Sequence, residues 1–90
     1  MIIAGSMGMT GAAYLASLAA LRSGAGLTVT CAPSSLNDIY ENKITEGLTL
    51  SCEDNEKGFF QFSNLKQILD HSEECDSVLI GPGLGNHRST

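Results

Sequence analysis

The sequence predicts an α/β domain in which helices cover both faces of a mostly parallel sheet. Two observations support this prediction. Short apolar or β-branched runs at residues 1–4, 27–32 and 77–80 alternate with helical patterns. In addition, the first and last of these runs each break into a glycine-rich turn, at residues 5–11 and 81–85. The 90 residues are enough for one small domain.

The first 32 residues predict a βαβ unit. Residues 1–4 are an apolar run suited to a strand that is buried on both faces. Residues 11–23 predict a helix that is apolar almost all round, so we expect its outer side to be covered as well. Gly24 and Gly26 end this helix, and residues 27–32 form a second strand that ends before Pro33. The two strands should be parallel.

The second half of the chain is less regular. Ser34 or Ser35 is expected to cap a helix at 36–43, and Ser63 a helix at 64–71 with apolar residues on one face. Residues 48–52 read as a short strand, and 52–58 as an exposed turn. Residues 58–62 form either a strand or a loop whose aromatic side chains pack inward, and 77–80 form the last strand.

Composition excludes several classes of protein. The net charge is −5 and the five cations are scattered, so we expect no nucleic-acid partner. No apolar run approaches the roughly 18 residues of a membrane span, and no basic segment of a signal peptide precedes the first strand, so we expect a cytoplasmic protein without membrane contact. The three cysteines are far apart and are expected to be reduced and buried. The acidic residues at 38–56 and 70–76, His71 and His87 are expected to lie at the surface.

The first glycine loop, residues 5–11, has glycines at positions 5, 8 and 11. This spacing matches neither the GxGxxG dinucleotide fingerprint nor the P-loop, which needs a lysine where Ala12 stands. With Thr10 as the N-cap, the amides of residues 11–13 would point toward a ligand above the sheet. The alternative is that these glycines only allow an alanine-rich helix to pack closely on the sheet, and the sequence leaves both readings open.

The second glycine loop, Gly81-Pro82-Gly83-Leu84-Gly85, follows the last strand. Its proline fixes one φ angle and its glycines remove side chains, so it predicts a rigid wall of bare main chain. Both loops leave the carboxyl ends of strands, where open α/β sheets bind ligands. Together they predict a cleft for a flat, extended ligand.

These motifs carry a family resemblance. The run IIAGSMGMTGAAYLASLAALRSGAGLTVTCAP, followed by SVLIGPGLG, closely resembles the start of the ADP- or ATP-dependent NAD(P)H-hydrate dehydratases. The resemblance implies a three-layer, ribokinase-like (Rossmann-like) fold, of which residues 1–90 would be the N-terminal part of a single domain. It also implies a lyase that dehydrates NAD(P)H hydrate, a repair of damaged nicotinamide nucleotide, at the expense of ADP or ATP and with Mg²⁺.

The resemblance also implies roles for individual residues. The hydrated nicotinamide nucleotide would lie against Ala12 and Gly83, shaped by the neighbours Gly5, Ser6, Gly11 and Gly85. None of these transfers a proton, and the resemblance implies that the family's His-Pro-Gly-Glu, nucleotide-holding Lys-Gly and catalytic aspartate segments lie downstream of these 90 residues. We therefore expect an N-terminal fragment that is inactive alone. Glu46 stands where relatives carry a different segment, so the resemblance assigns it no role. Replacing Gly83 by valine is expected to weaken ligand binding without changing the melting temperature.

Two alternatives from other classes remain. A ribokinase-like kinase would transfer phosphate from ATP to a hydroxyl group of a sugar or vitamin precursor, and fold analogy alone does not separate it from a dehydratase. A non-catalytic half-domain would act only through association with another chain. Its incomplete sheet would expose apolar surface and an unpaired edge, so we expect homo-oligomers.

Overall fold

The structure, a computed structural model, describes residues 1–86, so that His87 lies outside the described residues. Its centre is a sheet of four parallel strands in the order β3-β2-β1-β4. This confirms the predicted parallel βαβ unit and the predicted strands at 48–52 and 77–80. Strands β1 (Ile2–Ile3) and β4 (Leu79–Ile80) are shorter than predicted, and β3 (Leu48–Cys52) has the predicted bounds. Strand β2 (Val29–Pro33) begins later than predicted and includes Pro33, which was expected to end it.

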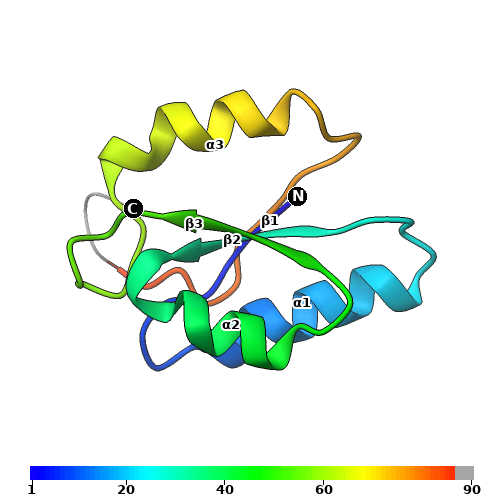
Figure 1. Cartoon of the computed structure of the whole chain (residues 1–90), viewed down its shortest axis with the longest axis horizontal. Helices are drawn as coiled ribbons and strands as arrows, with labels where there is room; N and C mark the ends of the chain where they lie inside the picture. The colour runs from blue at the N-terminus through cyan, green and yellow to red at the C-terminus, as the bar shows by residue number, and fades with distance from the viewer. Residues whose placement is uncertain (87–90) are drawn as a thin grey trace.

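Helices cover both faces of the sheet, as predicted. The helices are α1 (Thr10–Arg22), α2 (Asn37–Lys43) and α3 (Leu65–Ser72), and single 3₁₀ turns, η1 (Ser34–Leu36) and η2 (Phe62–Asn64), precede the last two. In Figure 1, α1 and α2 lie below the sheet and α3 lies above it. The fold is therefore a three-layer α/β arrangement consistent with part of a ribokinase-like domain. No helix within residues 1–86 is long and apolar enough to cross a membrane.

Two small cores hold the layers together. Beneath the sheet, apolar residues from β1, α1, β2 and α2 form one cluster: Ile2, Ala4, Ala13, Ala32, Leu36, Tyr40 and Ile44. A buried hydrogen bond between the hydroxyl groups of Ser17 and Thr30 joins α1 to β2 within this layer. Above the sheet, Ile3, Phe60 and two cysteines form the second cluster.

The cysteines agree in part with the prediction. Cys31 and Cys52 are free and fully buried, whereas the free Cys75 is only half-buried. A hydrogen bond with Cys52, and then burial, raise the pKa of the Cys31 thiol. Because a thiol with a raised pKa stays protonated at neutral pH, Cys31 packs as a small apolar side chain and is not reactive.

The first helix differs from the prediction in two ways. Leu15 on its outer side is 64% exposed, so nothing within the described residues covers that side. Thr10 lies inside α1, and the N-cap is Met9, whose carbonyl oxygen accepts the Ala12 amide at 3.2 Å. Since that amide is already paired, the prediction that it points freely toward a ligand is wrong.

The predicted serine caps are also wrong. Leu36 is the N-cap of α2, while the hydroxyl groups of Ser34 and Ser35 donate to the carboxylate of Asp54 instead. Before α3, Gln61 and Asn64 form a capping box in place of Ser63. The predicted turn at 52–58 is exposed at Glu53, Asn55, Glu56 and Lys57, but Asp54 within it is fully buried. Residues 58–61 form a loop whose Phe60 packs inward, while Phe62 is 74% exposed.

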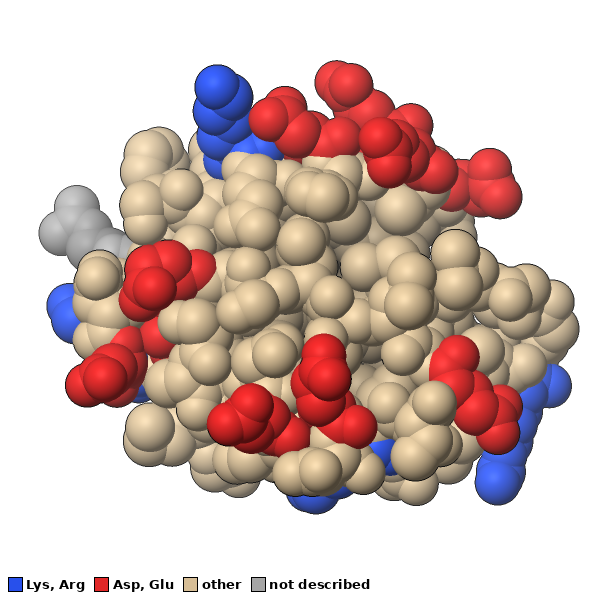
Figure 2. Space-filling model, in the orientation of Figure 1, with Lys and Arg blue, Asp and Glu red and all other residues tan. Residues whose placement is uncertain are grey.

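Acidic side chains otherwise lie at the surface, as predicted. Asp70, Glu73, Glu74 and Asp76 are all exposed. Figure 2 shows acidic side chains gathered over the C-terminal end of α3, whereas the Lys and Arg side chains on this face stand apart from one another. This face therefore carries no continuous positive patch.

The outer edge of the sheet at β4 exposes apolar surface, which confirms the expectation for an incomplete sheet. Val78, Leu79 and Ile80 are 43%, 44% and 68% exposed. Between β4 and α3 lies a groove of about 520 Å³, whose walls are mostly apolar and include Leu65, Ile68 and Leu69 of α3. The apolar face of α3 is therefore only partly covered by the described residues.

The buried hydroxyl pair predicts a coupled loss of stability. Replacing Ser17 with alanine leaves the fully buried Thr30 hydroxyl without its partner, at a cost of about 1–3 kcal/mol in the free energy of unfolding. Adding Thr30→Val should recover part of that loss because no unpaired hydroxyl remains. Urea unfolding of both single variants and the double variant measures this coupling. Ser23→Ala at the exposed end of α1 is the control, and additive losses would contradict the prediction.

Candidate functional site

The strand order reverses beside β1, and this reversal indicates where a ligand-binding site is expected. From β1 the chain moves outward through β2 to β3, and it then returns to the other side of β1 as β4. The first glycine loop leaves the carboxyl end of β1, and the second leaves that of β4. In open α/β sheets, ligands bind outside the carboxyl ends of the strands at such a switch point.

Main-chain hydrogen bonds join the two glycine loops directly. The Gly5 amide donates to the Pro82 carbonyl oxygen at 2.9 Å, and the Gly81 amide donates to the Ile3 carbonyl oxygen at 3.0 Å. The buried Ser6 hydroxyl donates to the Gly83 carbonyl oxygen at 2.8 Å. The loops therefore continue the pairing of β1 with β4 beyond the strand ends.

Two glycines make this close approach possible. Gly83 has φ +77°, and a Cβ atom at this position would lie 2.8 Å from the Cβ of Ala12. Gly5 has φ +79°, and a Cβ atom there would collide with the hydroxyl of Tyr40. Since both positions also have backbone angles that L-residues rarely adopt, only glycine fits. Gly83 is thus required for packing, and the expectation that Gly83→Val leaves the melting temperature unchanged is wrong.

A pocket of about 300 Å³ opens where a third loop, residues 53–61, meets the two glycine loops. The Met7 amide donates to the Gly58 carbonyl oxygen at 2.6 Å, which ties the third loop to the first. We call this the candidate pocket, and its lining residues come from all three loops: Ser6, Met7, Met9, Gly58, Phe59, Leu84, Gly85 and Asn86.

Among the described residues, the lining of the candidate pocket carries no ionisable side chain. Met7, Met9, Phe59 and Leu84 give it apolar walls, while Ser6 and Asn86 supply polar groups. Such a pocket can bind a flat, uncharged ring, but none of these side chains serves as a general acid or base at neutral pH. Within residues 1–86, no group of three or more His, Cys, Asp or Glu side chains is placed to hold a metal ion.

The structure brings together five of the six residues that the sequence assigns to substrate binding. Ser6 and Gly85 line the candidate pocket, while Gly5, Ala12 and Gly83 form the packed contact behind it. Gly11 is the exception, because it lies in the first turn of α1 with open space where its side chain would be. No local contact explains a glycine at this position.

Sequence reasoning missed the third loop and its buried carboxylate. Burial alone would raise the pKa of Asp54, but hydrogen bonds from Ser35, Gly58, Ser34 and Glu56 outweigh burial and hold that pKa below its usual range. The signal available in the sequence was weak, because an aspartate amid Glu53-Asp54-Asn55-Glu56-Lys57 looks like any solvated turn. Its hydrogen-bond partners Ser34 and Ser35 lie 20 and 19 positions earlier in the chain.

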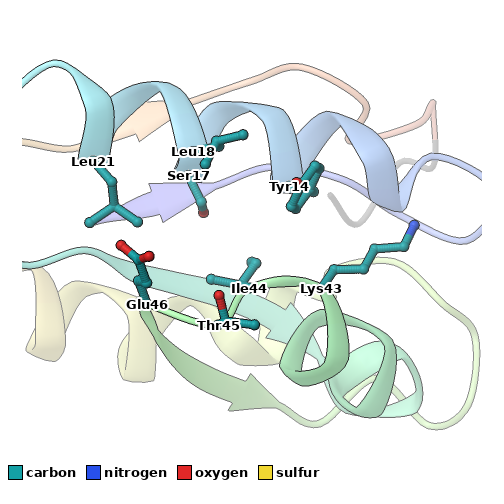
Figure 3. A pocket seen from close by; sticks show the side chains of 8 residues that line it. All are labelled: Tyr14, Ser17, Leu18, Leu21, Lys43, Ile44, Thr45 and Glu46. Atoms are coloured by element: carbon teal, nitrogen blue, oxygen red, sulfur yellow. The ribbon is translucent and has the colours of Figure 1, made fainter.

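A second hollow, between α1 and the end of α2, contains Glu46 (Figure 3). It holds only about 70 Å³, which is room for a few water molecules. Figure 3 shows Glu46 beside Leu21 at the far end of α1, whereas Lys43 extends toward the start of that helix. Glu46 precedes β3 and thus lies at the amino edge of the sheet, away from the glycine loops. His71 is exposed near the end of α3.

The fold and the site together define a class of protein: a parallel α/β domain with a ligand pocket at its topological switch point. The model of the NAD(P)H-hydrate dehydratase family matches residues 1–90. The chain therefore belongs to the NAD(P)H-hydrate dehydratase family.

Individual relatives agree with this assignment. The chain is 38% identical over 88 residues to the bifunctional NAD(P)H-hydrate repair enzyme Nnr of Moorella thermoacetica, covering 98% of this chain and 17% of the relative. It is 36% identical over 90 residues to the Nnr of Methanothermobacter thermautotrophicus, again 17% of that protein. It is 32% identical over 85 residues to the ADP-dependent (S)-NAD(P)H-hydrate dehydratase of Listeria monocytogenes, covering 94% of this chain and 27% of the relative. The chain thus spans a small part of each relative.

The contact between Gly83 and Ala12 predicts unequal effects of two glycine substitutions. Gly83→Ala and Gly85→Ala both place a side chain at positive φ, at a cost of about 1–2 kcal/mol each. Only Gly83→Ala also forces a Cβ atom against Ala12, whereas a Cβ at position 85 would lie 3.6 Å from the Ser6 hydroxyl, an ordinary contact. We therefore expect the melting temperature of Gly83→Ala to be clearly lower than that of Gly85→Ala. Equal losses would contradict the close packing.

The depressed pKa of Asp54 predicts how stability depends on pH. A carboxyl group whose pKa is lower in the folded state adds stability above its unfolded pKa of ~3.9, and this stability is lost as the pH falls toward the folded value. Asp54→Asn should lower the free energy of unfolding by about 1.5–3 kcal/mol at neutral pH.

The difference in the free energy of unfolding between the wild type and Asp54→Asn should then shrink in acid. Urea unfolding at neutral pH and at pH values below ~3.9 measures it. The exposed neighbours Glu53, Glu56 and Lys57 are present in both proteins and cancel in the comparison. A difference that stays constant through the acid range would contradict the assignment of this pH dependence to Asp54.

Proposed function

We propose that residues 1–90 are the N-terminal part of a ribokinase-like domain and form one side of the substrate site of an ADP- or ATP-dependent NAD(P)H-hydrate dehydratase. The observation that carries the proposal is the uncharged pocket at the hydrogen-bonded glycine loops, in a chain that belongs to this family. Hydrated NAD(P)H carries an uncharged, partly saturated ring with a carboxamide group. The thioether and aromatic walls suit the ring, and Ser6 and Asn86 suit the carboxamide.

The proposal assigns binding and not proton transfer to these residues. Dehydration breaks a C–O bond of the hydrated ring and removes a proton from the neighbouring atom, so it needs an acid and a base. The described residues of the candidate pocket supply neither, and residues 1–86 offer no cluster for Mg²⁺. The nucleotide, the metal ion and the proton-transfer groups would therefore be held by residues other than those described. The name of the Listeria relative supports ADP as the nucleotide on which the reaction depends, with ATP as the alternative.

We also propose a cytoplasmic location and a homo-oligomeric state. The free cysteines among the described residues support a reducing compartment. The exposed strand β4, with its unpaired main chain, supports association between copies. Sedimentation of the complete gene product measures the oligomeric state, and a monomer at all concentrations would contradict the proposed homo-oligomer.

The activity is tested with the complete gene product and hydrated NADH. We expect conversion to NADH, followed by its absorbance, only when ADP or ATP is also present. Phosphorylation of a sugar or vitamin precursor without this conversion would contradict the proposal.

The pocket is tested by placing a charge in it. Met9 is 42% exposed and lines the candidate pocket, so Met9→Glu should leave folding intact. A carboxylate there would lose solvation on binding and repel a ligand that carries phosphates. We expect the KM for hydrated NADH to rise roughly tenfold, or about 1.4 kcal/mol of binding. The matched control is Leu15→Glu, on the exposed side of α1, and an equal KM in the two variants would contradict the assignment of the pocket.

A further inference from the structure

One buried carboxylate outside the candidate pocket is hydrogen-bonded to the loop that forms one wall of this pocket. Asp54 is fully buried, although its neighbours Glu53, Asn55, Glu56 and Lys57 are all exposed. Its side chain does not line the candidate pocket. An aspartate is rarely buried unless its oxygens are hydrogen-bonded, so its contacts indicate what it does.

The carboxylate of Asp54 joins two segments of the chain. From η1, the Ser34 hydroxyl donates to one carboxylate oxygen at 2.9 Å, and the Ser35 hydroxyl donates to the other at 2.5 Å. From its own turn, the Glu56 amide donates at 3.0 Å and the Gly58 amide at 2.8 Å. Asp54 therefore fastens the turn at 55–58 to the carboxyl end of β2.

The turn that Asp54 fastens has an unfavourable backbone. Asn55 and Glu56 have φ +53° and +62°, and Gly58 has φ +80°. Two consecutive non-glycine residues in the left-handed region persist only where surrounding contacts impose them. The amides of Glu56 and Gly58, which donate to Asp54, belong to two of these residues. Removing the carboxylate would thus let the turn relax.

The turn is in direct contact with the first glycine loop. The carbonyl oxygen of Gly58 accepts the Met7 amide at 2.6 Å, and a Cβ atom at position 58 would lie 2.6 Å from the Cβ of Met7. Gly58 and Phe59 form one side of the candidate pocket, and Met7 and Met9 form another. A movement of residue 58 therefore changes the width of the pocket.

We propose that Asp54 is a positioning residue for substrate binding, which holds Gly58 against Met7 and so fixes the separation of the two walls of the candidate pocket. The proposal rests on the proposed function for the identity of the ligand. Because the described residues of the pocket include no proton-transfer group, the effect of Asp54 is on affinity and not on the chemical step. A purely structural role would instead lower stability and leave the affinity of the folded protein unchanged.

Steady-state kinetics of the complete gene product with hydrated NADH separate these roles. In Asp54→Asn the KM should rise roughly tenfold or more, because small displacements of a binding wall have large effects. The kcat at saturating substrate should stay within roughly twofold. Ser35→Ala removes a single hydrogen bond and should raise the KM by a smaller factor, which keeps the proposal testable if Asp54→Asn fails to fold.

The control is a variant with a matched loss of stability elsewhere. Ile44 is buried in the core beneath the sheet and does not line the candidate pocket, so Ile44→Ala should lower the melting temperature without changing the KM. Hydrogen exchange at the Met7 amide should accelerate in Asp54→Asn and not in Ile44→Ala. The KM is measured well below the lowest melting temperature.

The outcomes distinguish the two proposals. Suppose that the wild type turns over normally. An unchanged KM in the folded Asp54→Asn and Ser35→Ala variants would then overturn the positioning role alone, and so would an equal rise of the KM in Ile44→Ala. A wild-type gene product that neither binds nor dehydrates hydrated NADH would overturn the proposed function, and this inference with it.

Discussion

The main-chain pairing of the two glycine loops is the constraint on which the site depends. The amides of Gly5 and Gly81 bind carbonyl oxygens across the gap between β1 and β4, so both loops leave the sheet in a fixed relation. The pairing requires positive φ at Gly5 and Gly83 and tolerates no side chain at either position. The walls of the candidate pocket that come from the two glycine loops are held in place by these few main-chain contacts.

Much of the fold could be predicted because it follows from periodicity. Apolar runs and helical patterns gave the parallel sheet, the three layers and both glycine loops, since these depend on residues close together in the chain. The errors lie where distant residues intervene. Ser34 and Ser35 read as helix caps, but a carboxylate about 20 positions away takes their hydroxyl groups. No local pattern could reveal that Asp54 would be buried, and so the third wall of the pocket was missed.

The sequence left packing and binding as alternative roles of the glycines; the structure supports packing at Gly5 and Gly83, and the proposed binding role is compatible with it. Gly83 is needed because Ala12 packs against it, and the same contact brings Leu84 and Gly85 to the rim of the pocket. A glycine in such a loop cannot be assigned to stability or to binding alone, because the packing creates the binding surface. Gly11 differs, since no neighbouring atom limits its side chain.

A pocket whose described lining is uncharged requires the surrounding structure to hold its walls at a fixed separation. Without an ion pair to orient a ligand, selectivity depends on the shape and spacing of the walls, and a wall that moves by a fraction of an ångström loses contact energy on every atom. The glycine loops meet this demand by pairing with each other, but the turn at 55–58 has no strand partner and an unfavourable backbone. A buried charge suits this purpose, because hydrogen bonds to an ionised group are stronger than neutral ones and hold several amides at once. The acidic residue in this turn thus acts within the protein, by ordering main chain, and its charge is not presented to the ligand.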